Sequence, residues 1–369
     1  MTIRTKTLTY SEKVVYTLRA IYEASGYQPY RMSKFEEYDL YARNKDFLVS
    51  DSVITFTDAD GKLLALKPDV TLSLIKNVKD APDALNRLYY DENVYRLAKG
   101  SGQFKEILQT GLECIGAVDD YTSYEVLRLA AECLLAVSKD VFLDVSHLGL
   151  VSAILEDAGL SGDDAARALA FIGEKNAHEL AALLDARGLK EEKAASVVSL
   201  ISVYGAPKAV LPKVKKLCAS ESAAKAFAEL EKVLAPFRSS PLESVLHVDF
   251  SVVSDTAYYN GVVFKGFVKG VPEPVLSGGR YDKLMARMGK KSGAIGFAVY
   301  LDALERFGEK ARSRDVDAVI LYNASTARAV IEERRTVLQQ SGKSVCVSRI
   351  LPEKLTYGEV IDLRKGRRS

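Results

Sequence analysis

The sequence has few of the residues that build metal sites and disulfide frameworks. Only three histidines are present, and the four cysteines, Cys114, Cys133, Cys218 and Cys346, are scattered without any C-x-x-C spacing. Such a set does not supply a plausible zinc cluster, so we expect neither a metal nor a cofactor. Isolated cysteines of this kind are typical of buried, reduced thiols, which fits a reducing cytoplasm.

Long apolar runs and a strong charge imbalance are also absent. No apolar stretch reaches membrane-spanning length, and residues 1–7 contain no apolar signal region. Lysine and arginine together number 51, against 49 for aspartate and glutamate, so composition gives no general argument for nucleic acid or an acidic surface. We therefore expect a cytoplasmic protein that does not associate with a membrane.

What remains is an ordinary globular composition in a chain longer than a typical domain. The 369 residues are 48% hydrophobic and 27% charged. Residues 149–236 are rich in alanine and leucine and show helical stripes, whereas residues 318–347 read as strand, helix and strand, closed by residues 359–363. We predict an α+β core over residues 1–310, with a helical insertion at about 149–236, and a small α/β domain over residues 311–369.

The first third of the chain predicts a helix followed by two β-hairpins. Residues 11–25 carry a helical apolar stripe with Ser11 placed to cap it, and the hairpins fall at residues 53–66 and 87–116. Asp69, just after the first hairpin, could cap the next helix or face a pocket, and capping is favoured. In the second hairpin, Gln109, Gly111 and Glu113 share one face, which must be either solvent or the wall of a polar pocket.

Two later features bear on helix starts and on histidine chemistry. Thr122 and Glu125 match a capping box before the helical stripe that ends near Val137. His247 alternates with apolar neighbours in a predicted strand and has no carboxylate pair nearby in sequence, so we expect a core or surface histidine and not a catalytic base.

The stretch from Ser254 to Asp282 predicts two strands joined by a proline-rich turn at residues 271–274. The glycine pair at residues 278–279 is expected to open the floor of a pocket, because a residue without a Cβ lets the backbone approach a ligand. Tyr259 and Tyr281 on either side can supply orienting hydroxyls. The alternative is a plain hairpin with a Gly-Gly bend and core tyrosines.

These pieces together resemble the catalytic core of class II histidyl-tRNA synthetases over roughly residues 10–305. The family's motifs occur in order as Thr55-Phe56-Thr57-Asp58, Leu66-Lys67-Pro68-Asp69-Val70-Thr71, Asn93-Val94-Tyr95-Arg96, Gln109-Thr110-Gly111-Leu112-Glu113-Cys114-Ile115-Gly116, Tyr258-Tyr259, Gly278-Gly279-Arg280-Tyr281-Asp282 and Gly296-Phe297-Ala298. Their joint order and spacing implies an antiparallel sheet flanked by helices.

The sequence departs from the synthetase pattern where ATP would bind. The family's arginine for the substrate carboxylate is replaced by Ser254, and its arginine for the ATP phosphates by Ala303. The adenine-binding loop after Arg96 also differs, with Ala98, Gln103 and Ile107 at its functional positions. Because fixed cations supply much of the catalysis of adenylate formation, these losses imply that synthetase activity is gone. The near-neutral charge and the short C-terminal domain imply that tRNA is not bound.

The amino-acid side of the synthetase pattern is retained. By resemblance, Asp69 and Gln109 should hold an α-ammonium with Thr71 beside them, and Glu113, Tyr259 and Tyr281 should surround an imidazole. The remaining residues of the implied histidine site are Arg96 and Tyr258. Val70 stands where the family has glycine, which narrows the turn before the helix.

A protein that keeps the amino-acid side and loses the ATP side resembles the regulatory subunits of ATP phosphoribosyltransferase. That resemblance implies a non-catalytic subunit that assembles with a short catalytic subunit and lets histidine, as effector, feed back on the first step of histidine synthesis. It also implies a dimer, with helix 11–25 as candidate face, although the same stripe could cover the sheet. The alternatives are a divergent class II ATP-dependent amino-acid ligase or histidyl-tRNA synthetase, and a synthetase-like module with another partner.

Overall fold

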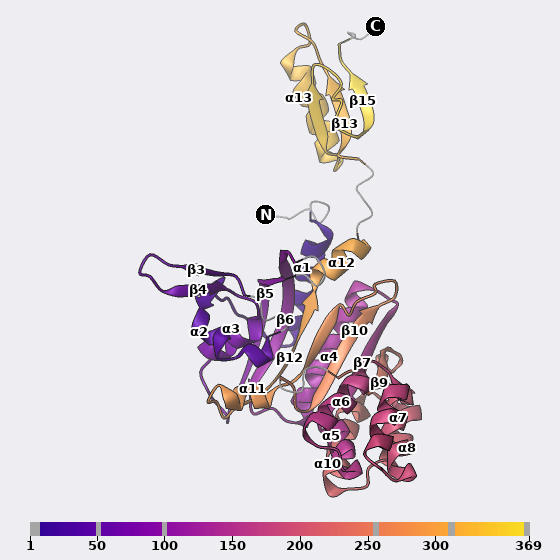
Figure 1. Ribbon diagram of the computed structural model, residues 1–369. Coiled ribbons are helices and arrows are strands. Elements are labelled where there is room, and N and C mark those ends of the chain that lie inside the picture. The colour runs from indigo at the N-terminus through magenta and orange to yellow at the C-terminus, as the bar shows by residue number, and fades with distance from the viewer. Residues whose placement is uncertain (1–7, 49–52, 98–101, 254–257, 309–313, 365–369) are drawn as a thin grey trace. The chain divides into compact units, whose positions relative to one another are not determined.

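The computed structural model describes residues 8–48, 53–97, 102–253, 258–308 and 314–364. Two compact units divide the chain, one over residues 1–307 and one over residues 308–369 (Figure 1). Ser254 and Ala98, which mark two departures from the synthetase pattern, lie outside the described residues. Of the helices in the described part of the chain, none combines the length and the apolar character needed to cross a bilayer.

A large sheet forms the centre of the first unit. Within the described residues its strands run in the order β1 (Gln28–Pro29), β5 (Leu85–Leu97), β6 (Phe104–Gly116), β12 (Gly293–Tyr300), β11 (Leu276–Arg280), β10 (Val262–Val268), β7 (Val141–His147), β9 (Leu246–Asp249) and β8 (Tyr204–Gly205). The pairs β1–β5 and β7–β9 are parallel and the others antiparallel. The predicted antiparallel sheet flanked by helices is therefore confirmed, with a parallel pair near each edge.

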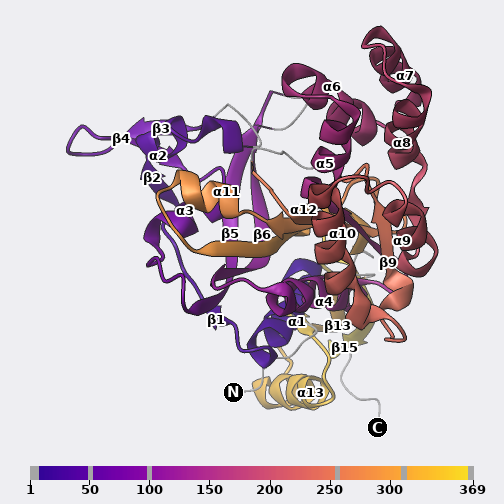
Figure 2. The same cartoon turned by 90° about the horizontal axis from the view of Figure 1, so that it is seen from below.

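The alternation of side chains along β6 explains how both faces of the sheet are covered. Leu112 and Cys114 belong to the larger core, with α1 (Tyr10–Ala24) and α4 (Asp120–Val137). Ile115, on the opposite face, packs in a second core with α3 (Val70–Asn77) and α11 (Asp282–Arg287). Figure 2 shows α1 and α4 on one side of these strands and α3 and α11 on the other.

The first helix differs in detail from its prediction. Thr9 is the N-cap and forms a capping box with Glu12, while Ser11 lies inside the helix and donates a hydrogen bond to Glu305. The apolar residues Val14 and Leu18 pack into the larger core. The stripe therefore covers the sheet, which is the alternative to its use as a dimer face.

The start of α4 is also earlier than predicted. Asp119 is the N-cap, and its side chain accepts a hydrogen bond from the backbone N–H of Thr122 at 2.7 Å. Thr122 is thus the third helical residue, and Glu125 pairs with Arg87 at 3.1 Å. The predicted capping box was wrong, although the helix itself is confirmed.

A small antiparallel sheet precedes the Asp69 turn in the sequence. It contains β2 (Phe35–Glu37), β4 (Leu63–Leu66) and β3 (Thr55–Thr57), in that order, which confirms the first predicted hairpin. The short helices α2 (Tyr38–Ala42) and η2 (Lys45–Phe47) follow β2. Strand β4 leads directly to Asp69 and α3, so this hairpin fixes the position of the Asp69 turn.

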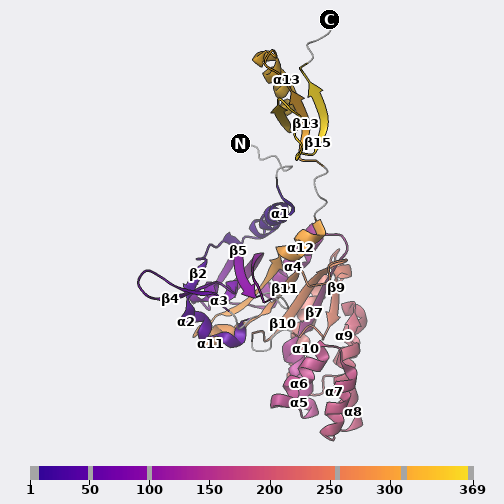
Figure 3. The same ribbon diagram turned by 45° about the horizontal axis from the view of Figure 1, so that its top comes forward.

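The predicted helical insertion lies between β7 and β9. It contains α5 (Leu148–Ala158), α6 (Gly162–Gly173), α7 (Ala177–Ala186), α8 (Glu191–Ser202), α9 (Pro207–Lys215), α10 (Glu221–Leu234), η3 (Ala235–Phe237) and η4 (Glu243–Val245). Figures 1 and 3 show these helices gathered at the side of the sheet where β7 and β9 lie. Their buried residues join the larger core, so the insertion is packed onto the sheet.

The second unit is a small parallel α/β fold. Its strands β14 (Val345–Ser348), β13 (Val316–Leu321) and β15 (Tyr357–Asp362) are parallel in that order, and α13 (Arg328–Gln340) connects the first two in sequence. The predicted strand, helix and strand with a closing strand is thus observed. Helix α12 (Leu301–Gly308) directly follows β12, the last strand of the first unit.

Candidate functional site

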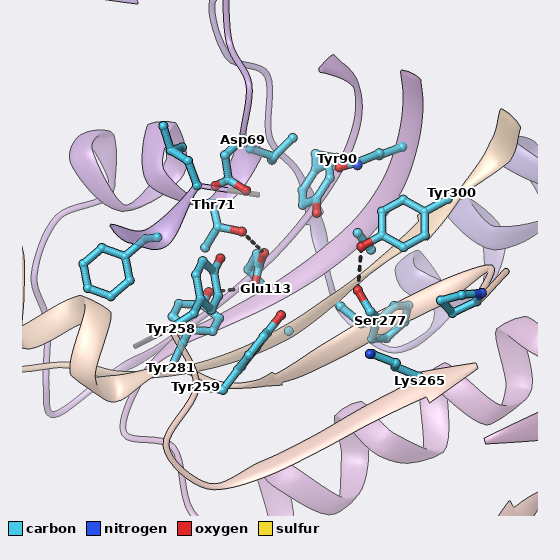
Figure 4. Close-up of a pocket in the computed structure, with 18 of the residues that line it drawn as sticks. Asp69, Thr71, Tyr90, Glu113, Tyr258, Tyr259, Lys265, Ser277, Tyr281 and Tyr300 are labelled. Atoms are coloured by element: carbon cyan, nitrogen blue, oxygen red, sulfur yellow. Dashed lines mark hydrogen bonds between the residues drawn. The ribbon is translucent and has the colours of Figure 1, made fainter. Parts of the chain in front are cut away.

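A cavity of about 550 Å³ opens on the face of the sheet opposite α1 and α4 (Figure 4). This volume falls in the range of about 300–1,000 Å³ that is usual for small-molecule sites. All eight residues predicted to contact histidine line it: Asp69, Thr71, Arg96, Gln109, Glu113, Tyr258, Tyr259 and Tyr281. Val70 also lines the cavity, so its side chain narrows the site without filling it.

Glu113 on β6 is the most deeply buried acid of the site. It is 2% exposed and accepts hydrogen bonds from the Tyr281 hydroxyl at 2.6 Å and the Thr71 hydroxyl at 3.1 Å. Burial raises the pKa of Glu113 from its usual 4.5 to about 8, although both hydrogen bonds act in the opposite direction. This raised pKa favours the protonated, uncharged form of Glu113 near neutral pH.

Two glycines leave open the space that the side chains of Glu113 and Tyr90 occupy. A Cβ on Gly296 of β12 would lie 1.8 Å from Glu113 Oε2 and 2.4 Å from the carbonyl oxygen of Leu112. A Cβ on Gly111 would lie 2.3 Å from the carbonyl oxygen of Phe297 and 2.7 Å from the Tyr90 hydroxyl. The Glu113 carboxylate therefore lies over β12, in space that only glycine leaves open.

The predicted role of the Gly278-Gly279 pair was wrong in one respect. A Cβ on Gly279 would lie 2.7 Å from the Tyr259 ring, and one on Gly278 would lie 2.3 Å from the carbonyl oxygen of Gly296. Neither glycine lines the cavity. The pair makes room for a tyrosine and for strand β12, and the glycine that lines the pocket is Gly296.

Asp69 both caps a helix and lines the pocket, so both roles that the sequence left open are observed together. Its side chain accepts a hydrogen bond from the backbone N–H of Leu72 at 2.9 Å, at the start of α3. Burial raises the pKa of Asp69, while the Arg96 guanidinium, 3.7 Å away, opposes that shift. Arg96 also donates a hydrogen bond to the carbonyl oxygen of Pro68 at 2.7 Å, so its charge is held beside the Asp69 turn.

Three tyrosines form a wall beside Glu113. The Tyr258 ring lies 4.6 Å from the Tyr259 ring and 5.8 Å from the Tyr281 ring, measured between centroids. Burial raises the pKa of each of these three hydroxyls well above its usual value, so they stay protonated and can donate hydrogen bonds. Aromatic faces and neutral hydroxyls around one carboxyl group suit a planar, nitrogen-containing ring.

Gln109 supplies a polar group that finds no hydrogen-bond partner in the part of the chain that the structure describes. It is 2% exposed and lines the cavity, and among the described residues its Nε2 makes no hydrogen bond. A buried donor without an acceptor is costly, which favours a site that a ligand completes.

The other end of the cavity contains residues that sequence analysis missed. Lys265 of β10, Ser277 of β11 and Tyr300 of β12 line it, and the Ser277 and Tyr300 hydroxyls are hydrogen-bonded at 2.5 Å (Figure 4). Lys265 and Ser277 are direct cross-strand partners. Period-two alternation marks each of them within its own strand, but only the strand order brings them to the same cavity.

Two of the described departures from the synthetase pattern pack against a hydrophobic core. Ala303 lies in α12 and packs against the larger core, and Ile107 on β6 packs against the second core. Among the described residues that line the cavity, the cations are Arg96 and Lys265.

His247 is not among the described residues that line the cavity. Its Nδ1 is 3.5 Å from an Asp144 oxygen and 3.2 Å from the Tyr204 hydroxyl, and its ring stacks on Phe142. Burial and the nearby Asp249 carboxylate raise the pKa of Asp144 to about 6. Asp144 and Asp249 therefore lie close enough that ionising both is unfavourable.

Replacing Tyr281 tests the geometry around Glu113 directly. In Tyr281→Phe, Glu113 loses its shortest hydrogen bond, so we expect the free energy of unfolding to fall by about 1–2 kcal/mol. Urea unfolding followed by circular dichroism measures this change. Tyr121→Phe, at an exposed position, controls for the loss of one tyrosine hydroxyl, and equal stability of both variants would contradict the assigned contact.

The fold is that of a class II aminoacyl-tRNA synthetase-like protein, with a polar pocket on one face of its sheet. The family model for histidyl-tRNA synthetase matches residues 5–304 of the chain. Those residues include the sheet, the insertion and every residue of the cavity lining.

Comparison with known proteins narrows this class. The chain is 30% identical to the ATP phosphoribosyltransferase regulatory subunit of Clostridium kluyveri, over 88% of this chain and 85% of that protein. A solved ATP phosphoribosyltransferase regulatory subunit/histidyl-tRNA synthetase from Bacillus halodurans has the same fold, with a TM-score of 0.78 and 24% identity, over 96% of this chain and 93% of that one. The chain belongs to the histidyl-tRNA synthetase-like family of ATP phosphoribosyltransferase regulatory subunits.

A third likeness, at 18% identity, concerns the fold alone. It is to a chain in the structure of the ATP phosphoribosyl transferase (HisG:HisZ) complex from Thermotoga maritima. The TM-score is 0.62, and the match covers 79% of this chain and 97% of that chain.

Proposed function

We propose that this chain is the non-catalytic regulatory subunit of ATP phosphoribosyltransferase. It assembles with the short catalytic subunit, is required with it for the first step of histidine biosynthesis, and binds histidine as the feedback effector. The observation that carries the proposal is a single cavity lined by all eight predicted histidine contacts, in a chain 30% identical to a regulatory subunit. The solved Thermotoga maritima complex supports assembly with the catalytic subunit.

The chemistry of the cavity suits histidine. A protonated Glu113 donates its proton to the bare nitrogen of a neutral imidazole ring, while a tyrosine hydroxyl oxygen accepts from the ring N–H. Asp69 and the carbonyl oxygen of Gln109 accept hydrogen bonds from the α-ammonium. Because Glu113 starts protonated, forming the imidazolium–carboxylate pair takes up no proton from solvent.

The same geometry supports the loss of synthetase activity. Catalysis of adenylate formation depends on cations fixed around a triphosphate. Of the cations that line the described part of the cavity, Arg96 is held beside Asp69, and Lys265 lies at the opposite end. We propose that the chain neither activates histidine with ATP nor binds tRNA, and that it pairs with a second copy of itself through a surface other than the apolar stripe of α1.

Histidine inhibition of the assembled enzyme tests the proposal. We expect histidine to inhibit phosphoribosyl transfer by the complex, and the variant Glu113→Ala to assemble normally by size-exclusion chromatography but to lose at least tenfold in sensitivity to histidine. Calorimetry should show histidine binding to the wild-type chain or to the complex. Absence of binding in both would end the effector role.

Pyrophosphate exchange separates this function from a divergent amino-acid ligase. The expected result is no histidine-dependent exchange between ATP and pyrophosphate above background. Exchange at a rate typical of active synthetases, on the order of 1 s⁻¹ or faster, would replace the proposal with the enzyme alternative.

A further inference from the structure

We propose that Lys265, together with the hydroxyls of Ser277 and Tyr300 and the amide of Gln109, holds the α-carboxylate of the amino-acid ligand. The inference rests on the proposed function and assigns the part of the cavity that recognises the ligand's negative charge. Its consequence is selectivity for a free amino acid over the corresponding amine.

A buried carboxylate needs a cation, and at the acidic end of the cavity the cation among the described lining residues, Arg96, lies beside Asp69. Asp69 and Glu113 line that end. Arg96 is directed to the carbonyl oxygen of Pro68 at 2.7 Å and lies 3.7 Å from Asp69, so much of its charge is offset there. A ligand carboxylate placed at this end would face two acids, and leaving an anion unpaired in a buried site is expensive.

The strand register brings a second set of polar groups to the opposite end. Lys265 pairs with Ser277, Ser277 pairs with Ala298, and Ala298 pairs with Gly111, so these residues form one row across four strands. Cross-strand partners present their side chains to the same face of a sheet, here the face of the cavity. Tyr300 is two residues beyond Ala298 and pairs with Gln109, which places a hydroxyl and an amide beside the row.

The distances across the sheet suit a small zwitterion. The Glu113 carboxylate lies over Gly296 of β12, as the 1.8 Å approach to a Cβ at that position shows. Lys265 is on β10, two strands or about 10 Å across the sheet and two residues or about 7 Å along it, and its long stem can extend over β11. In Figure 4, Lys265 and Ser277 lie on one side of the cavity and Glu113 on the other.

The donors at the Lys265 end match the acceptors of a carboxylate. Lys265 provides an ammonium, and Ser277 and Tyr300 provide two hydroxyls whose mutual hydrogen bond can be exchanged for one to the ligand. Gln109 Nε2, buried without a hydrogen-bond partner among the described residues, supplies a further donor. An imidazole at Glu113 and a carboxylate at Lys265 would therefore satisfy both ends of one histidine molecule.

Comparing the binding of histidine and histamine to the wild-type chain and to variants of Lys265 tests the inference. Histamine has the imidazole and amine of histidine and lacks only the carboxylate. We expect the wild-type chain to bind histidine about 10–100-fold more tightly than histamine, the worth of a charge-assisted contact, and Lys265→Met to reduce that preference to about threefold or less. Lys265→Arg should restore most of the preference, because a cation is present again.

The controls separate this inference from the proposed function. Lys269→Met removes an exposed lysine just after the same strand and should leave the preference unchanged. Thermal unfolding of each variant establishes that it is folded. A Lys265→Met variant that still prefers histidine by the wild-type ratio would overturn the inference and leave histidine binding intact. Failure of both the wild-type chain and its complex with the catalytic subunit to bind histidine would overturn both this inference and the effector role.

Discussion

Gly296→Ala is expected to abolish histidine binding and to destabilise the protein by about 1–3 kcal/mol or more. The added Cβ would lie 1.8 Å from Glu113 Oε2 and 2.4 Å from the carbonyl oxygen of Leu112. The carboxylate can turn away only by leaving its contacts with Tyr281 and Thr71, and the backbone of β6 is fixed by its pairing with β12. Overpacking of this kind forces shifts that the surrounding sheet resists.

Calorimetry with histidine and urea unfolding measure the two effects of Gly296→Ala. Gly261→Ala is the matched control, because the three atoms nearest to a Cβ there all belong to the Arg280 side chain, at 3.3 Å or more, which can move. The control should bind histidine with wild-type affinity. Wild-type binding by Gly296→Ala would mean that the Glu113 carboxylate does not need the space over β12.

Glu113→Gln is expected to be more stable than the wild-type chain, by a margin that grows with pH. Burial raises the pKa of Glu113 to about 8 in the folded chain, against about 4.5 when unfolded. Between these values the folded state keeps a proton that the unfolded state releases, so the unfolding free energy of the wild type falls as pH rises, by up to about 1.4 kcal/mol per pH unit. Glutamine cannot ionise, so the variant escapes this loss.

Urea unfolding at pH 5, 7 and 9 measures that difference. The gap between Glu113→Gln and wild type should be small at pH 5, reach a few kcal/mol near pH 8, and then stay constant. Glu273→Gln, in the exposed turn between β10 and β11, is the control and should change stability little at any pH. A pH-independent gap would contradict a protonated Glu113 in the folded chain. The same variant should bind histidine more weakly, because an amide is neither a proton donor of comparable strength nor an anion.

The sequence predicts most secondary-structure elements because their patterns are local. Apolar periodicity gave α1, α4 and the insertion helices, and alternation gave both hairpins. Helix starts were less predictable. Thr9 and Ser11 both suit a helix N-cap, as do Asp119 and Thr122, and the backbone angles that choose between neighbours are not visible in residue types.

Some residues of the site could likewise be predicted from local sequence patterns, whereas others meet only through contacts between distant parts of the chain. Gln109 and Glu113 lie two strand steps of alternation apart on β6, and local patterns also singled out Asp69, Tyr259 and Tyr281. The family resemblance added Arg96 and Tyr258 and placed Thr71 beside the ammonium group. Lys265, Ser277 and Tyr300 could not be found this way, since their meeting depends on the order β10, β11, β12 in the sheet. The role of Gly296 likewise depends on which side chain leans over it from the next strand.

The parallel pairing of β7 with β9 limits how this chain can be shortened. The chain leaves β7 at His147 and forms its parallel neighbour, β9, only from Leu246 onward, running in the same direction beside it. Such neighbours cannot be joined by a tight turn, since the polypeptide must first travel back along the full length of the strand, which takes roughly a dozen residues or more. A truncated protein that lacks the helices between them must therefore keep a return segment, or the edge of the sheet will come apart.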